Sequence, residues 1–312
     1  MENALPSQYK LLSLVLFTLV VNLSFSQTQH VAITLTEEND FFTGTDRYFS
    51  NGTSLGLLFS RPVSGLTNRI LPGIPSFRPV AYGVTLTQNI YTPRRLQPKE
   101  FLQHDRPYAA TLLLALSQYS VSRNNRFGFY SEFSGGVVGH NAQGNDVQRI
   151  FHKIINDELP QGWENQVPNR VIANYQFNLS ALIYEGNHIA LLNNAKVNGG
   201  NLLDDVALGG TLRFGFLKSG HAMQSFFQHS RRVSAFVFVG AEQRYVIYNR
   251  LLATGFEDQE PPVTRWVNNV KYGFELAGRW FNISYAVNLL SQERDDLPNH
   301  RYGSLNMTFR IY

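Results

Sequence analysis

The sequence predicts an all-β fold, an antiparallel transmembrane β-barrel of about 12 strands with one short helix in a long extracellular loop. Three observations predict this fold class. Apolar and polar residues alternate over many stretches of about ten residues, the number of these stretches is even, and short turns alternate with long connections. A strand that faces lipid on one side and a polar lumen on the other needs this length and this alternation.

The alternation that defines the strands is clearest near the C-terminus. Phe281, Ile283 and Tyr285 alternate with Asn282 and Ser284, so one face of this stretch is apolar and the other is polar. Single-chain bacterial barrels have an even number of strands, and the count here is also even. The twelve predicted strands are 31–37, 49–60, 80–91, 109–122, 125–138, 171–184, 188–198, 205–217, 233–248, 264–277, 279–290 and 302–312.

The connections between these strands fall into two classes. Short turns on one rim and long loops on the other are typical of outer-membrane barrels. Segments 61–79 and 218–232 depart from this pattern, because they are long where short turns are expected. A soluble β protein stays open as the alternative, since its strands can alternate in the same way. Tight turns are predicted at 123–124, 185–187 and 278, and long loops at 38–48, 92–108, 139–170, 249–263 and 291–301.

The first segment has the form of a signal peptide. Lys10 precedes an apolar run over 11–21, and the small residues Ser24 and Ser26 follow it. This run of about 11 residues is shorter than the roughly 20 that a spanning helix needs. A short membrane anchor is the alternative. We therefore predict a signal peptide at 1–26 and one domain at 27–312.

Composition excludes several classes of function. Lys and Arg number 27 and Asp and Glu 23, which gives a net charge of +4, and no sustained basic run is present. We therefore expect no nucleic-acid partner, because phosphate binding needs a basic surface. The chain has no cysteine, so disulfides, zinc–thiolate sites and cysteine nucleophiles are excluded.

The long connection 139–170 contains the one helix that the sequence predicts clearly. Asn145 or Asp146 can cap it, and Gln148 and His152 are four residues apart, so they share a face. A helix packed over the rim would aim this amide and this imidazole at whatever lies beneath. A half-buried histidine without a function is the alternative. An apolar stripe runs beside this face and consists of Val147, Ile150, Phe151, Ile154 and Ile155.

Other polar residues gather where predicted strands end. Asn39 and Asp40 follow the first strand, and an Asx turn is their alternative reading. The Asp105–Arg106 pair precedes the fourth strand, and we expect a structural ion pair there. Trp163 is expected to pack within its loop rather than to take part in chemistry.

Five motifs in order resemble a known family, the outer-membrane lipid A 3′-O-deacylases. The similarity runs from about Val31 to Tyr175, and the family fold is a twelve-stranded barrel, in agreement with the independent strand count. The motifs are Glu38-Asn39-Asp40, Thr45 to Gly52, Tyr91-Thr92-Pro93, Asp105 to Ala109, and Gly144 to His152.

The resemblance implies a role for each matching residue in catalysis. His152 matches the general base, Gln148 a helper amide, and Asn39 one half of the polar pair of the site. Ser50 matches a hydroxyl position at the start of the second strand. Proton transfer by a positioned histidine is worth typically 10²–10⁴-fold in rate.

The resemblance also implies a calcium cofactor and a lipid substrate. Asp40 matches a calcium ligand, and Glu158 matches a second acidic ligand that reaches the site only if the helix ends or bends near Asn156. Arg94 or Arg95 matches a basic residue that meets the phosphate of the lipid. Calcium takes oxygen ligands, which carboxylates and backbone carbonyls supply.

The function implied by the resemblance is hydrolysis of the ester that holds the 3′-acyloxyacyl group of lipid A. We expect the site on the cell-surface side of a bacterial outer membrane, with lipopolysaccharide and membrane lipids as partners and a monomer as the simplest state. Three alternatives stay open: a serine-type esterase with Ser50 as nucleophile and His152 as its base, an outer-membrane phospholipase, and a non-enzymatic porin-like barrel.

Overall fold

Twelve antiparallel strands form the structure, a computed structural model that describes residues 30–44, 48–62, 67–94, 105–156, 158–217, 233–253 and 263–311. The predicted signal peptide at 1–26 and Arg95 lie outside the described residues. No helix in the described ranges is long and apolar enough to cross a membrane.

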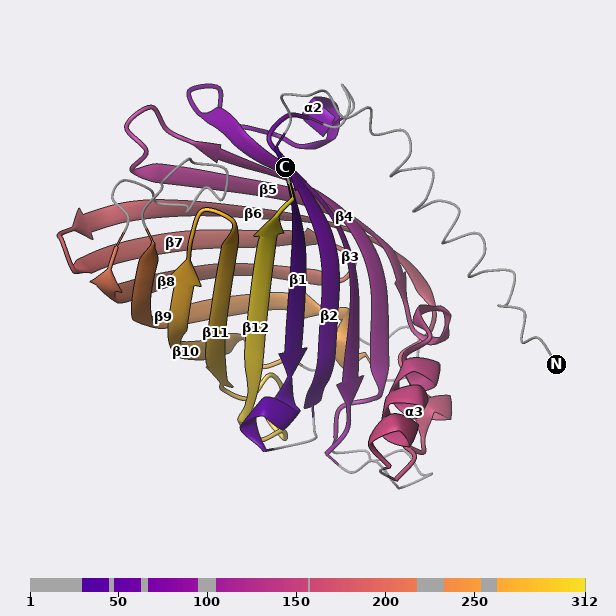
Figure 1. Cartoon of the computed structure of the whole chain (residues 1–312). Coiled ribbons are helices and arrows are strands. Elements are labelled where there is room, and N and C mark those ends of the chain that lie inside the picture. The colour runs from indigo at the N-terminus through magenta and orange to yellow at the C-terminus, as the bar shows by residue number, and fades with distance from the viewer. Residues whose placement is uncertain are drawn as a thin grey trace.

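The strands close into a barrel, because β12 pairs with β1 and places Ile33 opposite Phe309 (Figure 1). This confirms the predicted fold class, and every strand boundary lies within two residues of the sequence prediction. The strands are β1 Val31–Asn39, β2 Tyr48–Phe59, β3 Arg78–Thr92, β4 Ala109–Val121, β5 Phe127–Val138, β6 Arg170–Glu185, β7 Ile189–Gly200, β8 Leu203–Phe216, β9 Ser234–Asn249, β10 Trp266–Ala277, β11 Phe281–Leu290 and β12 His300–Arg310.

Short helices lie at the ends of the barrel. In Figure 1, η1 and α3 lie at the lower rim, and α2 lies at the opposite end near the C-terminus. The rim with η1 and α3 is therefore the rim on which the long predicted loops start and end. The helices are η1 Asp40–Thr43, α2 Thr67–Ile70, η2 His140–Ala142, α3 Gly144–Ile155, η3 Trp163–Asn165 and η4 Arg250–Leu252.

The helix predicted in the connection 139–170 is present as α3, but its capping differs from the prediction. The N-cap is Gln143, which has φ 58° and makes no side-chain cap hydrogen bond. Asn145 and Asp146 lie inside the first turn, because the helix begins one residue before the first of them. At the other end Asn156 adopts φ 57°, and its N–H donates to the carbonyl of His152.

The direction of the side chains along β4 shows which residues face outward. Leu114 is 43% exposed, whereas its neighbours Leu113 and Ala115 are buried and face the lumen. Residues paired directly across antiparallel strands lie on the same face, so the register transfers this assignment to the next strand. Ile90, which is paired with Ala110, therefore also faces outward.

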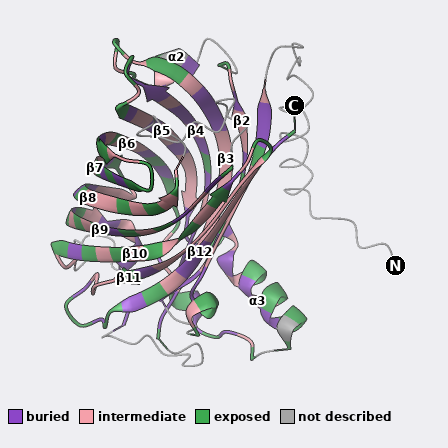
Figure 2. Cartoon of the chain, turned by 60° about the vertical axis from the view of Figure 1, so that its left-hand side comes forward, coloured by how far each residue is buried: buried purple, intermediate pink, exposed green. Residues whose placement is uncertain are grey.

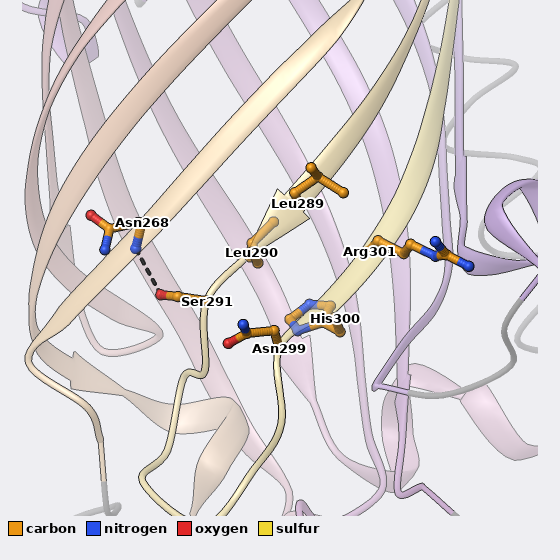
Figure 3. Close-up of a pocket in the computed structure, with 7 residues that line it drawn as sticks. All are labelled: Asn268, Leu289, Leu290, Ser291, Asn299, His300 and Arg301. Atoms are coloured by element: carbon orange, nitrogen blue, oxygen red, sulfur yellow. Dashed lines mark hydrogen bonds between the residues drawn. The ribbon is translucent and has the colours of Figure 1, made fainter.

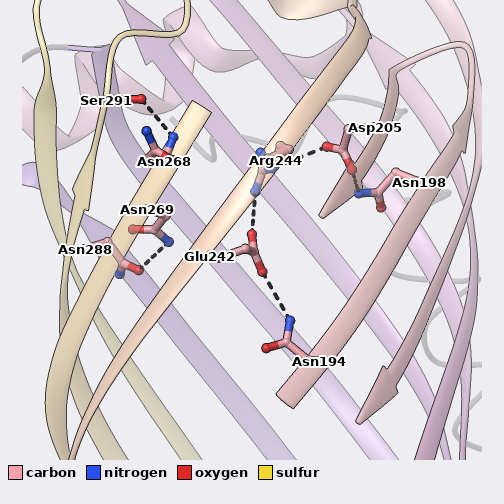
Figure 4. A network of polar contacts seen from close by, with 9 residues as sticks. All are labelled: Asn194, Asn198, Asp205, Glu242, Arg244, Asn268, Asn269, Asn288 and Ser291. Atoms are coloured by element: carbon pink, nitrogen blue, oxygen red, sulfur yellow. Dashed lines mark hydrogen bonds and ion pairs between the residues drawn. The ribbon is translucent and has the colours of Figure 1, made fainter. Parts of the chain in front are cut away.

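A network of charged and amide side chains lines the lumen along the neighbouring strands β7, β8 and β9 (Figure 4). Arg244 lies 3.4 Å from Asp205 and 3.4 Å from Glu242. Asn198 donates to Asp205 at 2.7 Å, and Asn194 donates to Glu242 at 3.5 Å. Because each charge in this network has a partner, the polar interior is held as a connected structure.

The predicted Asp105–Arg106 ion pair is wrong. Asp105 accepts hydrogen bonds from the backbone N–H groups of Arg94 at 2.7 Å and Arg106 at 2.8 Å. The guanidinium of Arg106 instead lies 3.4 Å from Glu293 and 4.6 Å from the ring centroid of Tyr91. Two adjacent side chains point in different directions along an extended chain, so the loop carboxylate and the lumen guanidinium find separate partners.

Glu293, in the loop between β11 and β12, keeps its negative charge through this contact. Burial alone would raise its pKa, but the nearby Arg106, with His300 and Arg244, holds the pKa below its usual value. The pair therefore contributes stability that is present above the ordinary carboxyl pKa and is lost as the pH falls through the lowered one.

Candidate active site

The start of α3 is fixed against the outer wall of the barrel. A Cβ atom on Gly144 would clash with Ala110 of β4 and would lie 2.6 Å from the indole of Trp163, so only glycine allows this approach. Gln88, which faces outward from β3, donates to the carbonyl of Ala142 at 2.7 Å. The helix therefore lies outside the barrel wall rather than over the lumen.

The face of α3 that points to the wall carries Gln148 and His152. Both side chains are buried, at 5% and 4% exposure, whereas Val147, Ile150 and Ile154 of the apolar stripe are exposed (Figure 2). The prediction that one face aims an amide and an imidazole inward is confirmed. The apolar stripe is not the packing face of this helix.

Trp163 fixes the orientation of the Gln148 amide. Its indole N–H donates to Gln148 Oε1 at 2.9 Å, and its ring packs against Tyr108 at 4.7 Å. Because Oε1 is the acceptor, the amide nitrogen is placed on the other side. Gln148 Nε2 is buried and has no hydrogen-bond partner within the described residues. Buried donors are normally satisfied, so this one is available to a bound molecule.

The ring of His152 is held by the backbone that follows the helix. His152 Nδ1 lies 2.6 Å from the carbonyl oxygen of Glu158. A carbonyl oxygen can only accept, so the proton lies on Nδ1 and the neutral ring carries its lone pair on Nε2. The left-handed turn at Asn156 returns the chain toward the ring, which is the helix end that the sequence analysis required. The Glu158 side chain itself is exposed.

Asn39 and Asp40 lie at the same rim, at the start of η1. Asn39 Oδ1 accepts from the N–H of Phe41 at 2.8 Å, which makes the Asx turn considered in the sequence analysis. The Asp40 side chain is only 1% exposed. Phe42 packs beside Gly303 and lies edge-on to Tyr285 at 6.2 Å, so η1 is held against the wall at β12 and β11.

Ser50 lies on β2, at an irregularity in the pairing with β3. The register shifts between Phe49 and Asn51, and Ser50 Oγ lies 2.5 Å from Thr92 Oγ1. Thr92 is a partner that the sequence analysis did not identify. Because η1 contacts β2 and α3 contacts β3, this hydroxyl pair lies between the two halves of the candidate site.

An outward-facing polar cluster on β1 and β2 was also missed. Asn51 donates to Glu37 Oε1 at 2.6 Å, and Thr53 donates to Glu37 Oε2 at 2.7 Å. Thr53 is paired with Gln88, which faces outward, so this cluster lies on the outer wall. The alternating apolar residues of β2 were the only signal that placed Asn51 inside a strand, and that placement is confirmed.

Comparison with known proteins identifies the family. The model of the family described as outer membrane protein LpxR matches residues 11–311. The chain belongs to the LpxR family. Its strands superpose on LpxR from Salmonella typhimurium with a TM-score of 0.71 at 20% identity, covering 89% of this chain and 99% of that chain. The translocator domain of the autotransporter NalP from Neisseria meningitidis gives a TM-score of 0.45 at 8% identity, covering 97% and 95% of the two chains. A comparison with curated proteins finds no match.

Membership of the LpxR family confirms the resemblance to the outer-membrane lipid A deacylases. It places the protein in an outer membrane and supports an enzyme that acts on lipid A.

The structure also shows where Arg94 lies and whether acidic and histidine side chains cluster. Arg94 is exposed and lies at the same rim, and in the described ranges no three His, Asp or Glu side chains gather in a way that could hold a metal ion.

A separate cavity opens at this rim of the LpxR-family barrel. It has a volume of about 510 Å³ and lies between the ends of β10, β11 and β12 (Figure 3). None of the predicted site residues lines it, so the sequence motifs do not point to this cavity. Its lining residues are Asn268, Leu289, Leu290, Ser291, Asn299, His300 and Arg301.

Proposed function

We propose that the chain is a calcium-dependent lipid A 3′-O-deacylase in which His152 activates water. The observation that carries the proposal is the buried ring of His152, whose Nδ1 is engaged by the Glu158 carbonyl at 2.6 Å. This contact leaves Nε2 as the basic atom, which general-base catalysis requires. Family membership supports the class of substrate.

The donor atoms at the candidate site are of the chemical type that binds calcium. Asp40 supplies a buried carboxylate, and the main chain of η1 supplies carbonyl oxygens, which are the donors that calcium prefers. Glu158 is the proposed second ligand, and its exposed carboxylate would have to turn inward to serve. When bound, calcium would polarise the ester carbonyl and stabilise the negative charge of the transition state.

His152 performs the proton transfers in the proposed reaction. Its Nε2 takes a proton from water as the water oxygen attacks the ester carbonyl carbon, and the same proton then goes to the departing sugar oxygen. The products are a fatty acid and a sugar hydroxyl. The Glu158 carbonyl accepts from Nδ1–H throughout and stabilises the imidazolium that forms between the two transfers.

Gln148 and the polar residues of the wall bind and orient the substrate in this proposal. The unpartnered Nε2 of Gln148 donates to an oxygen of the bound lipid, and Arg94 meets a phosphate at the rim. Asn39 holds the turn that presents Asp40. A site outside the barrel wall suits a substrate that is itself a membrane lipid, since the acyl chains need not enter a polar lumen. We place the site on the cell-surface side, where the long loops of such barrels lie.

The proposal is tested by mass spectrometry of lipid A incubated with the protein. With calcium, we expect lipid A to lose the mass of the 3′-acyloxyacyl group, and with a chelator its mass should be unchanged. Phosphatidylethanolamine offered in parallel tests the phospholipase alternative. Cleavage of that lipid with intact lipid A would contradict the proposal.

Replacing Ser50 by alanine separates a supporting hydroxyl from a nucleophile. Ser50 Oγ is engaged by Thr92 at 2.5 Å, not by His152, so we expect Ser50→Ala to lose only a few fold in kcat. Removal of a serine nucleophile costs about 10⁶-fold in a serine protease. Rates measured on lipid A decide between the two. A loss of that size, together with a fluorophosphonate adduct on Ser50 in the unaltered enzyme, would support the serine esterase.

A porin would conduct ions through its lumen, but side chains occupy the lumen of this barrel. Arg244 and its acidic partners project into the interior from β8 and β9, and the rings of Phe49 and Tyr302 pack at 4.8 Å near one end. We expect no steady conductance from the protein in a planar lipid bilayer. Long-lived conductance steps of uniform size would instead favour a pore.

A further inference from the structure

The outer face of α3 is an apolar surface that no described part of the chain covers. This α3 stripe consists of Val147, Ile150, Phe151 and Ile154, whose exposed fractions run from 37% to 76%. Gln148 and His152 lie roughly a third of a turn away and face the wall. The helix therefore uses its polar face for its own packing and turns its apolar face outward, the reverse of a helix in a water-soluble protein.

The position of α3 determines what this stripe meets. Gly144 is packed against Ala110, the second residue of β4, so the helix begins beside the rim and outside the barrel. Leu114, which is exposed on the outer wall, follows Ala110 by four residues, or roughly 13 Å along the strand. The stripe thus lies outside the barrel at its rim, on the same side of the wall as the exposed Leu114.

The third face of α3 carries two basic residues, whose positive charge attracts phosphate groups. Arg149 and Lys153 lie on the side of the helix away from Gln148 and His152, and Lys153 is exposed. Basic residues beside an apolar stripe are typical of helices that lie in a membrane interface. On the opposite side of the candidate site, η1 exposes Phe41 and Phe42 at 74% and 42%, so a second apolar contact exists at the same rim.

We propose that the α3 stripe is a membrane-docking surface that inserts among the acyl chains of the outer leaflet, with Arg149 and Lys153 at the lipid phosphates. This docking is inferred from the position of the helix and does not depend on the proposed reaction. It assigns two faces of one helix to different tasks, because the face with His152 serves the site and the apolar face binds the lipid surface.

Single cysteines test the proposal directly, because the natural chain has no cysteine. Full-length protein carrying Ile154→Cys or Ile150→Cys is labelled with the fluorophore NBD and reconstituted into phosphatidylcholine–phosphatidylglycerol vesicles. Brominated acyl chains quench only probes that reach the hydrocarbon. Asp146→Cys is the matched control on the same helix, and Phe274→Cys on the exposed barrel wall is the positive reference.

We expect brominated chains to quench the probes at 150 and 154 at least about half as strongly as the probe at 274, with blue-shifted emission. The probe at 146 should be quenched several-fold less. Equal, weak quenching at 146, 150 and 154 would overturn the proposal. Shielding of position 154 that disappears when the protein is diluted in lipid would also overturn it, since the stripe would then contact a second copy of the chain. Neither result depends on deacylase activity.

Discussion

His152→Asn should lower kcat on lipid A by roughly 10²–10⁴-fold, while KM changes little. Asparagine keeps a polar side chain of similar reach and can donate toward the Glu158 carbonyl, as Nδ1–H does at 2.6 Å. It has no basic nitrogen that can take a proton from water near neutral pH. The variant thus removes the proton transfer and preserves most of the packing. Initial rates of 3′-acyl release, measured by mass spectrometry, provide the readout.

The matched control for this prediction is His140→Asn. His140 is an exposed histidine at the start of the same long connection and has no part in the proposed reaction. We expect this variant to keep the rate within about 2-fold. If His152→Asn retained full activity in correctly folded protein, His152 would not be the base. If both variants lost activity equally, the loss would report damage to the loop rather than lost proton transfer.

The strands were predictable from the sequence because their signal is local. Phe281, Ile283 and Tyr285 face one way and Asn282 and Ser284 the other, and no tertiary contact is needed to read that period. The same holds for Gln148 and His152, since residues four apart on a helix share a face. In both cases the spacing along one element determines which side chains share a face.

Contacts between distant elements were not predictable in this way. Nothing local indicates that Ser50 meets Thr92 or that Arg106 turns from Asp105 to Glu293, because these pairings depend on register and loop course. The capping of α3 was wrong for a related reason. Gly144 enters the helix because it must pass close to Ala110, and a residue further along the chain then loses the N-cap position.

The outward face of α3 shows a limit of amphipathic patterns in membrane proteins. The pattern identifies which face is apolar, but the solvent decides which face is buried within the protein. For a helix outside a barrel wall, lipid can take the place that a protein core has elsewhere. The polar face then packs inward, and this arrangement buries Gln148 and His152 against the barrel wall.

Asp40→Asn should shift the calcium response to higher concentrations and leave the barrel intact. The substitution keeps the shape of a side chain that is 1% exposed but removes its negative charge. Calcium binds carboxylates far better than amides. Changing even an outer-shell partner of a metal site typically lowers metal affinity by about 10–100-fold. We therefore expect half-maximal activity of this variant to need at least about 10–100-fold more calcium. Calcium titrations of deacylation, with heat-modified gel mobility as the measure of barrel folding, check the prediction.

Glu158→Gln makes this test more informative, because Glu158 is exposed whereas Asp40 is buried. The main-chain carbonyl of Glu158 contacts His152, and the Glu158 side chain is exposed, so the substitution keeps the carbonyl contact that orients the ring. If Glu158 turns inward to bind calcium, its variant should weaken the calcium response as Asp40→Asn does. A normal calcium titration for Glu158→Gln beside a shifted one for Asp40→Asn would make Asp40 the principal acidic ligand. Normal titrations for both variants, or full activity in a chelator, would contradict the calcium site, because no remaining proposed ligand carries a negative charge.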